Sequence, residues 1–194
     1  MHLTSLPSPW GIGAMGRAAR DFADFLAEGG QSWWQILPIG PTSYGDSPYQ
    51  SFSTFAGNPY LIDLDELEGE GLLEREEYET ISWGDDPASV DYGLMYEKRY
   101  TVLRKAMARL LSSPPEDYAA FLEEGKSWLP DYSLFMALKD AHGGRPWWEW
   151  PEALRRRQPD ALRAARREFS GDIMFWQGVQ YLFFPAVAGA EGLH

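Results

Sequence analysis

The 194-residue sequence contains no cysteine and only three histidines. The absence of cysteine excludes a disulfide scaffold, a thiolate metal site and a cysteine nucleophile. No stretch reaches the roughly 18 consecutive apolar residues of a membrane-spanning helix, and the first ten residues lack the basic and apolar regions of a secretory signal peptide. We therefore expect a cytoplasmic chain with no membrane partner, forming one domain or one domain with a sizeable insertion.

Basic residues are scarce, with 17 Lys and Arg against 29 Asp and Glu, for a net charge of -12. This balance disfavours nucleic acid, whose binding depends on cations that neutralise phosphates, and it leaves neutral ligands open. A local run of arginines over 155–167 is interpreted as a solvated helix face that answers the acidic surface. Aromatic residues are plentiful at 15 %, including 9 Trp. Such rings pack in cores, but they also cover the apolar face of a sugar, so both interpretations stay open.

The sequence also lacks the short motifs of metal, phosphate and nucleophilic sites, since no HExxH, GxxxxGK[ST] or GxSxG is present. His2, His142 and His194 are scattered, and His142 is expected at a helix C-terminus. We therefore expect no metal site. Asp63 and Asp65 are two residues apart and could pair as carboxyl groups. The alternative is that they cap the helix that follows.

Periodicity predicts an α/β beginning and a helical remainder. A helix is expected over 17–28, followed by a glycine stop and a buried strand over 32–37, which together form part of a βαβ unit. A short strand or a buried extended segment is expected over 60–64. Helices are predicted around 65–68 and 74–79, and over 93–111, 115–125, 130–141 and 159–184.

The loop over 41–59, PTSYGDSPYQSFSTFAGNP, follows the carboxyl end of the predicted strand, where α/β folds build their sites. Its length alone suggests a functional loop. It offers flat aromatic faces and hydrogen-bonding side chains at Tyr44, Asp46, Ser47, Tyr49, Gln50, Phe52, Phe55 and Asn58. This surface suits a neutral, polyhydroxylated ligand, and the alternative is a self-packed Ω-loop.

Five segments resemble the amylomaltase family, the 4-α-glucanotransferases also called disproportionating enzymes. They are HLTSLPSPWGIG (2–13), WWQILPIGPTSYGDSPYQSFSTFAGNPYLIDL (33–64), VDYGLMYEKR (90–99), DYSLFMALKDAHGGRPWWEWP (131–151) and VQYLFF (179–184). The resemblance spans nearly the whole chain, and the loop motif is its most specific part. The chain is similar to the N-terminal part of such an enzyme.

The resemblance implies a (β/α)8 barrel of the TIM type with helical insertions. It also implies transfer of α-1,4-glucan segments between maltooligosaccharides with retained configuration, by a carboxylate nucleophile and a carboxylic acid. No metal or organic cofactor is implied. Tyr49 matches the tyrosine that packs against the sugar at the cleaved bond, and Asp46 and Ser47 would line the cleft. Tyr44 and Tyr96 match a second, remote glucan-binding site of some members, although Tyr96 also lies on the apolar stripe of its helix.

Two departures from the family limit what is expected of this chain. Motifs such as RIDHFRG, which carry the family's catalytic carboxylates, are absent, so no Asp or Glu here is assigned a catalytic role. The chain is also shorter than the roughly 250 residues of a complete barrel. We expect a partial barrel with only the first strands in 1–64 and a helical insertion subdomain in 65–184. The chain alone should be inactive and prone to association, and the alternatives are a non-catalytic glucan-binding module or a retaining glucan hydrolase.

The last ten residues, PAVAGAEGLH (185–194), depart abruptly from the family. We expect this tail to be non-native and to arise from a frameshift, because a shifted reading of compatible codons restores the family's usual continuation. The coding DNA tests this hypothesis. It fails if no overlapping frame past Phe184 encodes the rest of an amylomaltase.

Overall fold

The computed structural model describes residues 1–42, 44–86 and 88–191, with the backbone alone described for 44 and 185–191. The chain forms two compact units. Unit 1 comprises Met1–Pro114 together with the segment from Gln180 onward, and unit 2 comprises Pro115–Val179. The boundary expected between residues 64 and 65 therefore lies inside unit 1. Of the predicted tail, residues 185–191 continue the last helix, and residues 192–194 lie outside the described part.

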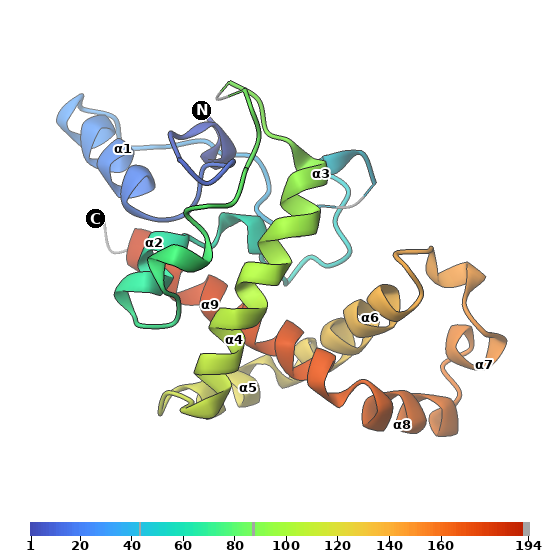
Figure 1. The fold of residues 1–194 in the computed structure, drawn as a ribbon. Helices are drawn as coiled ribbons and strands as arrows, with labels where there is room; N and C mark the ends of the chain where they lie inside the picture. The colour runs from blue at the N-terminus through green and yellow to red at the C-terminus, as the bar shows by residue number, and fades with distance from the viewer. Residues whose placement is uncertain (43, 87, 192–194) are drawn as a thin grey trace. The chain divides into compact units, whose positions relative to one another are not determined.

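Unit 1 is built around one long helical rod that runs through three consecutive segments (Figure 1). These are α3 (Tyr92–Leu94), a π-helical turn (Met95–Arg99) and α4 (Tyr100–Ser112). The α4 side chains at helical spacing are buried, namely Val102, Leu103, Ala106, Met107 and Leu110. An apolar stripe of this kind must pack against the rest of its unit. The helix predicted over 93–111 is confirmed, with the π-helical turn as a local difference.

The remaining elements of unit 1 are helices and single 3-10 turns. They are α1 (Arg17–Glu28), α2 (Leu64–Gly69), the C-terminal part of α9 (Ser170–Glu191), and 3-10 turns at Leu3–Ser5, Tyr44–Asp46, Pro59–Leu61 and Arg75–Glu77. The structure confirms the helix predicted over 17–28 with the same bounds. It ends where Gly29 and Gly30 follow, and Gly30 adopts a φ of +73°, a conformation that glycine takes without strain.

Neither of the strands predicted over 32–37 and 60–64 is present in the structure. Within the described ranges, the sole β-pairing is an isolated antiparallel bridge between Thr42 and Ser51. The segment 32–37 has no ladder, and Trp33 is 92 % exposed. A buried parallel strand needs neighbouring strands for its amides and covered faces for its side chains. Here the Leu37 amide donates to His2 Nδ1 at 3.2 Å instead.

The second predicted strand, over 60–64, forms a buried 3-10 turn that leads directly into α2. Because neither segment pairs, the described residues contain no sheet. The partial barrel predicted for 1–64 is therefore not confirmed, because the described residues of this segment form no hydrogen-bonded strands.

Unit 2 is helical, as predicted. It contains α5 (Tyr118–Glu124), α6 (Leu129–Ala141), α7 (Glu152–Arg155), α8 (Pro159–Glu168) and the first part of α9. The single helix predicted over 159–184 is two helices, because α8 ends at Glu168 and Phe169 leaves the helical conformation. Asp172 favours a new N-terminus, as an acid in the first turn of α9.

The arginines of unit 2 pair with carboxylates. Arg157 and Arg166 both reach Asp131, at 2.7 and 3.0 Å, and Arg163 pairs with Asp160. Arg163 and Arg166 lie in α8, so the interpretation as a charged helix face that answers acidic groups is confirmed for these two. Arg157 pairs in the same way from the turn between α7 and α8. Among the described residues, no helix is long and apolar enough to cross a membrane.

Candidate functional site

The loop over 41–59 is closed at its base by backbone contacts. The Asn58 amide donates to the Ile39 carbonyl at 2.8 Å, and Thr42 and Ser51 form the bridge noted above. The Ser51 hydroxyl then donates to the Ser53 carbonyl at 2.7 Å. These contacts bring the two ends of the loop together, which a ligand-binding loop and the self-packed Ω-loop alternative both require.

Helix α9 anchors the end of this loop through Gln180. The Gln180 side chain is fully buried, accepts from the Gly57 amide at 2.7 Å and donates to the Gly57 carbonyl at 3.1 Å. One side chain thus satisfies both backbone groups of one loop residue, as a neighbouring strand would do. A Cβ at position 57 would lie 2.0 Å from the Phe183 ring, so only glycine fits there without a shift.

Arg99 holds the segment directly after the loop. It is fully buried in the π-helical turn of the rod. Its Nη2 donates to the Tyr60 carbonyl at 3.3 Å and to the Ile62 carbonyl. Burial lowers the pKa of Arg99 to about 10, so the guanidinium stays protonated at neutral pH. The loop exit is therefore fixed from two helices, α9 and the rod.

The tip of the loop, in contrast, presents its side chains to solvent. Tyr49 is 72 % exposed, and its amide donates to the Ser47 hydroxyl at 3.3 Å. Asp46 is exposed and has a φ of +54°, a conformation that costs energy for a residue other than glycine. The predicted Tyr44 side chain lies outside the described atoms. The predicted ligand contacts Tyr49, Asp46 and Ser47 thus share one accessible loop tip.

The structure places Asp46 next to a tyrosine cluster in which only Tyr96 was a predicted site residue. The ring of Tyr60 lies 6.3 Å from that of Tyr92 and 5.8 Å from that of Tyr100. Burial and the Asp46 carboxylate raise the pKa of Tyr92. Burial is also the largest cause that raises the pKa of Tyr60 to about 12, and Asp46 adds to it.

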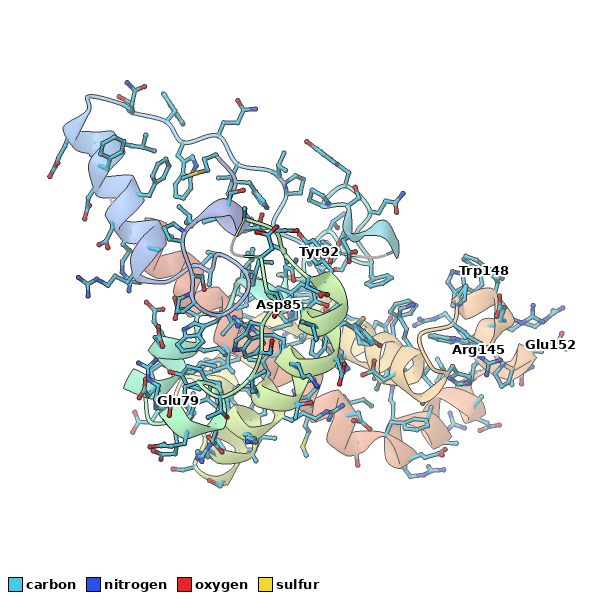
Figure 2. The ribbon with its side chains drawn as sticks, turned by 45° about the horizontal axis from the view of Figure 1, so that its top comes forward. Glu79, Asp85, Tyr92, Arg145, Trp148 and Glu152 are labelled. Carbon is cyan, nitrogen blue, oxygen red and sulfur yellow. The ribbon has the colours of Figure 1, made fainter. Side chains whose placement is uncertain are left out.

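Tyr96 belongs to the same cluster, with its ring 5.9 Å from the Tyr100 ring at an interplanar angle of 80°. It is 60 % exposed, which disfavours the alternative that it is a core residue. Figure 2 shows Tyr92 near the start of the rod. The spacing of four between Tyr92, Tyr96 and Tyr100 is the signal that could have predicted this shared face.

Asp63 and Asp65 do not form a free carboxyl pair. Asp63 accepts from the Asp65 amide at 2.9 Å and caps α2, which confirms the capping alternative for this residue. The Asp65 carboxylate accepts from the side chains of Trp10, Arg75 and Tyr78, at 3.0, 2.9 and 2.9 Å. Carboxylates with these structural partners are poor candidates for a nucleophile and an acid.

A cavity of about 430 Å³ lies elsewhere in unit 1 and is lined by residues 4–9, 11–13, 83–86 and 88–90. Asp85, labelled in Figure 2, belongs to its lining. The lining of this cavity contains none of the predicted site residues. Within the described ranges, no group of three or more His, Asp or Glu side chains could hold a metal ion.

Comparison with known proteins gives a consistent result. A model of the family described as 4-alpha-glucanotransferase matches residues 1–192. The 4-alpha-glucanotransferase of Clostridium butyricum is 47 % identical over 184 residues, covering 95 % of this chain and 38 % of that protein. The 4-alpha-glucanotransferase of Thermus thermophilus is 50 % identical over 188 residues, covering 95 % of this chain and 37 % of that protein.

Solved structures agree with the sequence matches. The amylomaltase from Streptococcus agalactiae in complex with acarbose has a TM-score of 0.96 and 43 % identity, covering 100 % of this chain and 39 % of that one. The amylomaltase from Corynebacterium glutamicum has a TM-score of 0.67 at 16 % identity, covering 99 % and 27 %, and shares the fold. The chain thus spans less than two fifths of the length of these relatives.

Proposed function

The chain belongs to the 4-alpha-glucanotransferase family, and from that membership we propose that it forms part of an enzyme that transfers α-1,4-glucan segments between maltooligosaccharides. The observation that carries this proposal is the match of the family model along residues 1–192. The accessible tip of the loop 41–59 supports it, because an exposed tyrosine beside a carboxylate and a hydroxyl suits a neutral sugar.

The role proposed for this chain is to hold the glucan. Tyr49 would cover the apolar face of a sugar ring, while Asp46 and Ser47 would accept and donate hydrogen bonds to its hydroxyls. Tyr96, exposed on the tyrosine cluster, would take part in a second glucan contact together with Tyr44. A pre-formed loop loses little entropy on binding, and the anchors at Gly57 and Tyr60 supply that rigidity.

The bond-breaking step is not assigned to this chain. Family members are expected to retain configuration through a covalent glycosyl intermediate, which needs two carboxyl groups that act as a pair. Asp63 and Asp65 are committed to a helix cap and to hydrogen bonds with neighbouring side chains. We therefore propose that the 194-residue chain binds maltooligosaccharides without turning them over.

Incubation of the chain with maltotriose tests this proposal. The expected result is unchanged maltotriose by chromatography. Glucose together with longer maltodextrins would show that the chain itself performs transfer. Glucose and maltose without longer products would instead favour a retaining hydrolase, the alternative activity.

A non-catalytic glucan-binding module is the second candidate, and the exposure of Tyr49 favours it. Under this alternative, glucan affinity is the whole function of the chain. Glucan binding without turnover that is lost in Tyr49→Ala is common to both candidates. Activity of a longer polypeptide that includes this sequence would separate them.

A further inference from the structure

Unit 2 exposes two adjacent tryptophans at a turn that the proposed function does not use. Trp147 is 51 % exposed and Trp148 is 59 % exposed. Their rings meet edge to face, with centroids 6.0 Å apart. Figure 2 shows Trp148 directed away from the ribbon, at the same end of the unit as Arg145 and Glu152. Large exposed aromatic surfaces on a folded unit commonly mark a binding site.

The turn that carries this pair is rigid without help from either indole. Trp150 is buried, and its Nε1 donates to the Arg145 carbonyl at 3.1 Å. Its ring stacks on His142, with centroids 5.3 Å apart at an angle of 24°. Lys139 donates to the Gly144 carbonyl at 2.7 Å. One tryptophan of the WWEW segment therefore builds the turn, and the other two are left available for a ligand.

Backbone contacts fix the outer part of the turn as well. The Trp150 amide donates to the Trp147 carbonyl at 3.2 Å, and Arg155 Nη1 donates to the Trp148 carbonyl at 3.3 Å. Because these contacts use main-chain atoms, replacing either exposed indole leaves them in place. A rigid aromatic surface binds with a small entropy cost.

The side chains beside the pair supply both donors and acceptors. Arg145 spends its Nε on the His142 carbonyl at 3.1 Å and leaves its two Nη groups without a partner among the described residues. Glu149 is exposed, and its carboxylate supplies the acceptors. Sugar hydroxyls need both kinds of group, whereas a polyanion or a polycation would need charge of one sign.

From this arrangement we propose that Trp147 and Trp148 form an accessory binding surface for α-1,4-glucan, separate from the loop 41–59. The indoles stack on successive apolar sugar faces, and Arg145 and Glu149 bond the hydroxyls at the edge. The choice of α-1,4-glucan as ligand rests on the proposed function. The surface would keep a long polysaccharide attached to unit 2.

Affinity electrophoresis of the 194-residue chain in native gels containing amylopectin tests this proposal. The unmodified chain should be retarded relative to a gel without polysaccharide. The double variant Trp147→Ala with Trp148→Ala should be retarded less. Its apparent Kd for amylopectin should rise about tenfold, which corresponds to about 1.4 kcal/mol. Phe25→Ala is the matched control, because Phe25 is a 65 % exposed aromatic residue of unit 1 that belongs to neither proposed glucan surface. This variant should migrate like the unmodified chain.

Tyr49→Ala separates this proposal from the proposed function. If Tyr49→Ala abolishes retardation and the double substitution does not, the loop binds glucan and the tryptophan surface is refuted. If the double substitution abolishes it and Tyr49→Ala does not, the surface holds and the loop assignment fails. No retardation of the unmodified chain contradicts both.

A second measurement guards against loss of fold in the double variant. Maltoheptaose should shift the indole N–H NMR signals of Trp147 and Trp148 in the unmodified chain, and dextran should not. Unshifted signals would overturn the proposal. So would a double variant that loses self-association but keeps its retardation, because the pair would then be an interface between copies.

Discussion

Tyr49 and Gly57 belong to the same loop and have opposite environments. Tyr49 is open to solvent at the tip, whereas Gly57 is held on both backbone groups by Gln180 and pressed against Phe183. Tyr49, the proposed ligand contact, is therefore accessible, whereas Gly57, which fixes the loop, is buried. This division explains how a segment rich in glycine and proline can present a defined surface.

His2 provides a test at the residue scale, through pH. Burial and the N-terminal ammonium lower the pKa of His2 from its ordinary 6.5, and its Nδ1 accepts from the Leu37 amide. The unfolded chain binds this proton more readily, so the stability that His2 contributes is present above about pH 6.5 and falls as the pH drops toward the folded pKa. An NMR titration should give a His2 midpoint below 6.5.

His2→Ala is the control for that titration, because other groups also titrate in acid. The loss of unfolding free energy between pH 7.5 and 5.5 should be smaller in His2→Ala than in the unmodified chain. An equal loss in both chains, or a His2 midpoint above 6.5, would show that the Leu37 contact does not hold the imidazole neutral.

Some residue-level features follow from local sequence and others do not. The cap formed by Asp63 and the position of His142 at the end of α6 were predictable, because both depend on neighbours a few residues away. The Gln180 contact was not, because its partner lies 123 residues earlier. No property of Gln180 in the sequence marks it as a buried anchor.

At the scale of elements, helices and strands differ in how far sequence predicts them. A helix satisfies its own amides, so the stripe of α1 and the glycines after it were enough to give its bounds. A strand needs partners from elsewhere in the chain. The apolar segment 32–37 has the composition of a buried strand, yet it forms no β-bridge with any of the described residues.

The anchor between α9 and the loop yields an element-scale prediction. Gln180→Leu would leave the Gly57 amide and carbonyl buried and unpaired, at a cost of about 2 to 4 kcal/mol. Gln177→Leu is the matched control on the same helix, because Gln177 is only partly buried and has no comparable backbone partner among the described residues. Urea unfolding should show a large loss for Gln180→Leu and little change for Gln177→Leu, and equal effects would refute the anchor.

At the scale of the whole molecule, the chain matches part of the length of longer proteins. It spans less than two fifths of its relatives and keeps their structure over its length. The segment 32–37 leaves Trp33, Ile36 and Leu37 exposed. An unpaired, apolar extended segment is a template for association with another chain.

We therefore predict that the isolated chain self-associates through 32–37. Sedimentation velocity should show a weight-average sedimentation coefficient that rises with protein concentration. Trp33→Ser with Ile36→Ser should weaken this association by about tenfold or more. Met174→Ser, which removes an exposed apolar side chain of unit 2, should have no such effect. An unmodified chain that stays monomeric at every protein concentration measured would contradict the prediction.

An NMR titration of the chain, with labelled tyrosine, by maltoheptaose measures sugar binding at Tyr49. We expect the ring signals of Tyr49 to shift saturably while no transfer product forms. Tyr49 signals that stay unchanged at millimolar maltoheptaose, with the chain folded, would contradict this expectation.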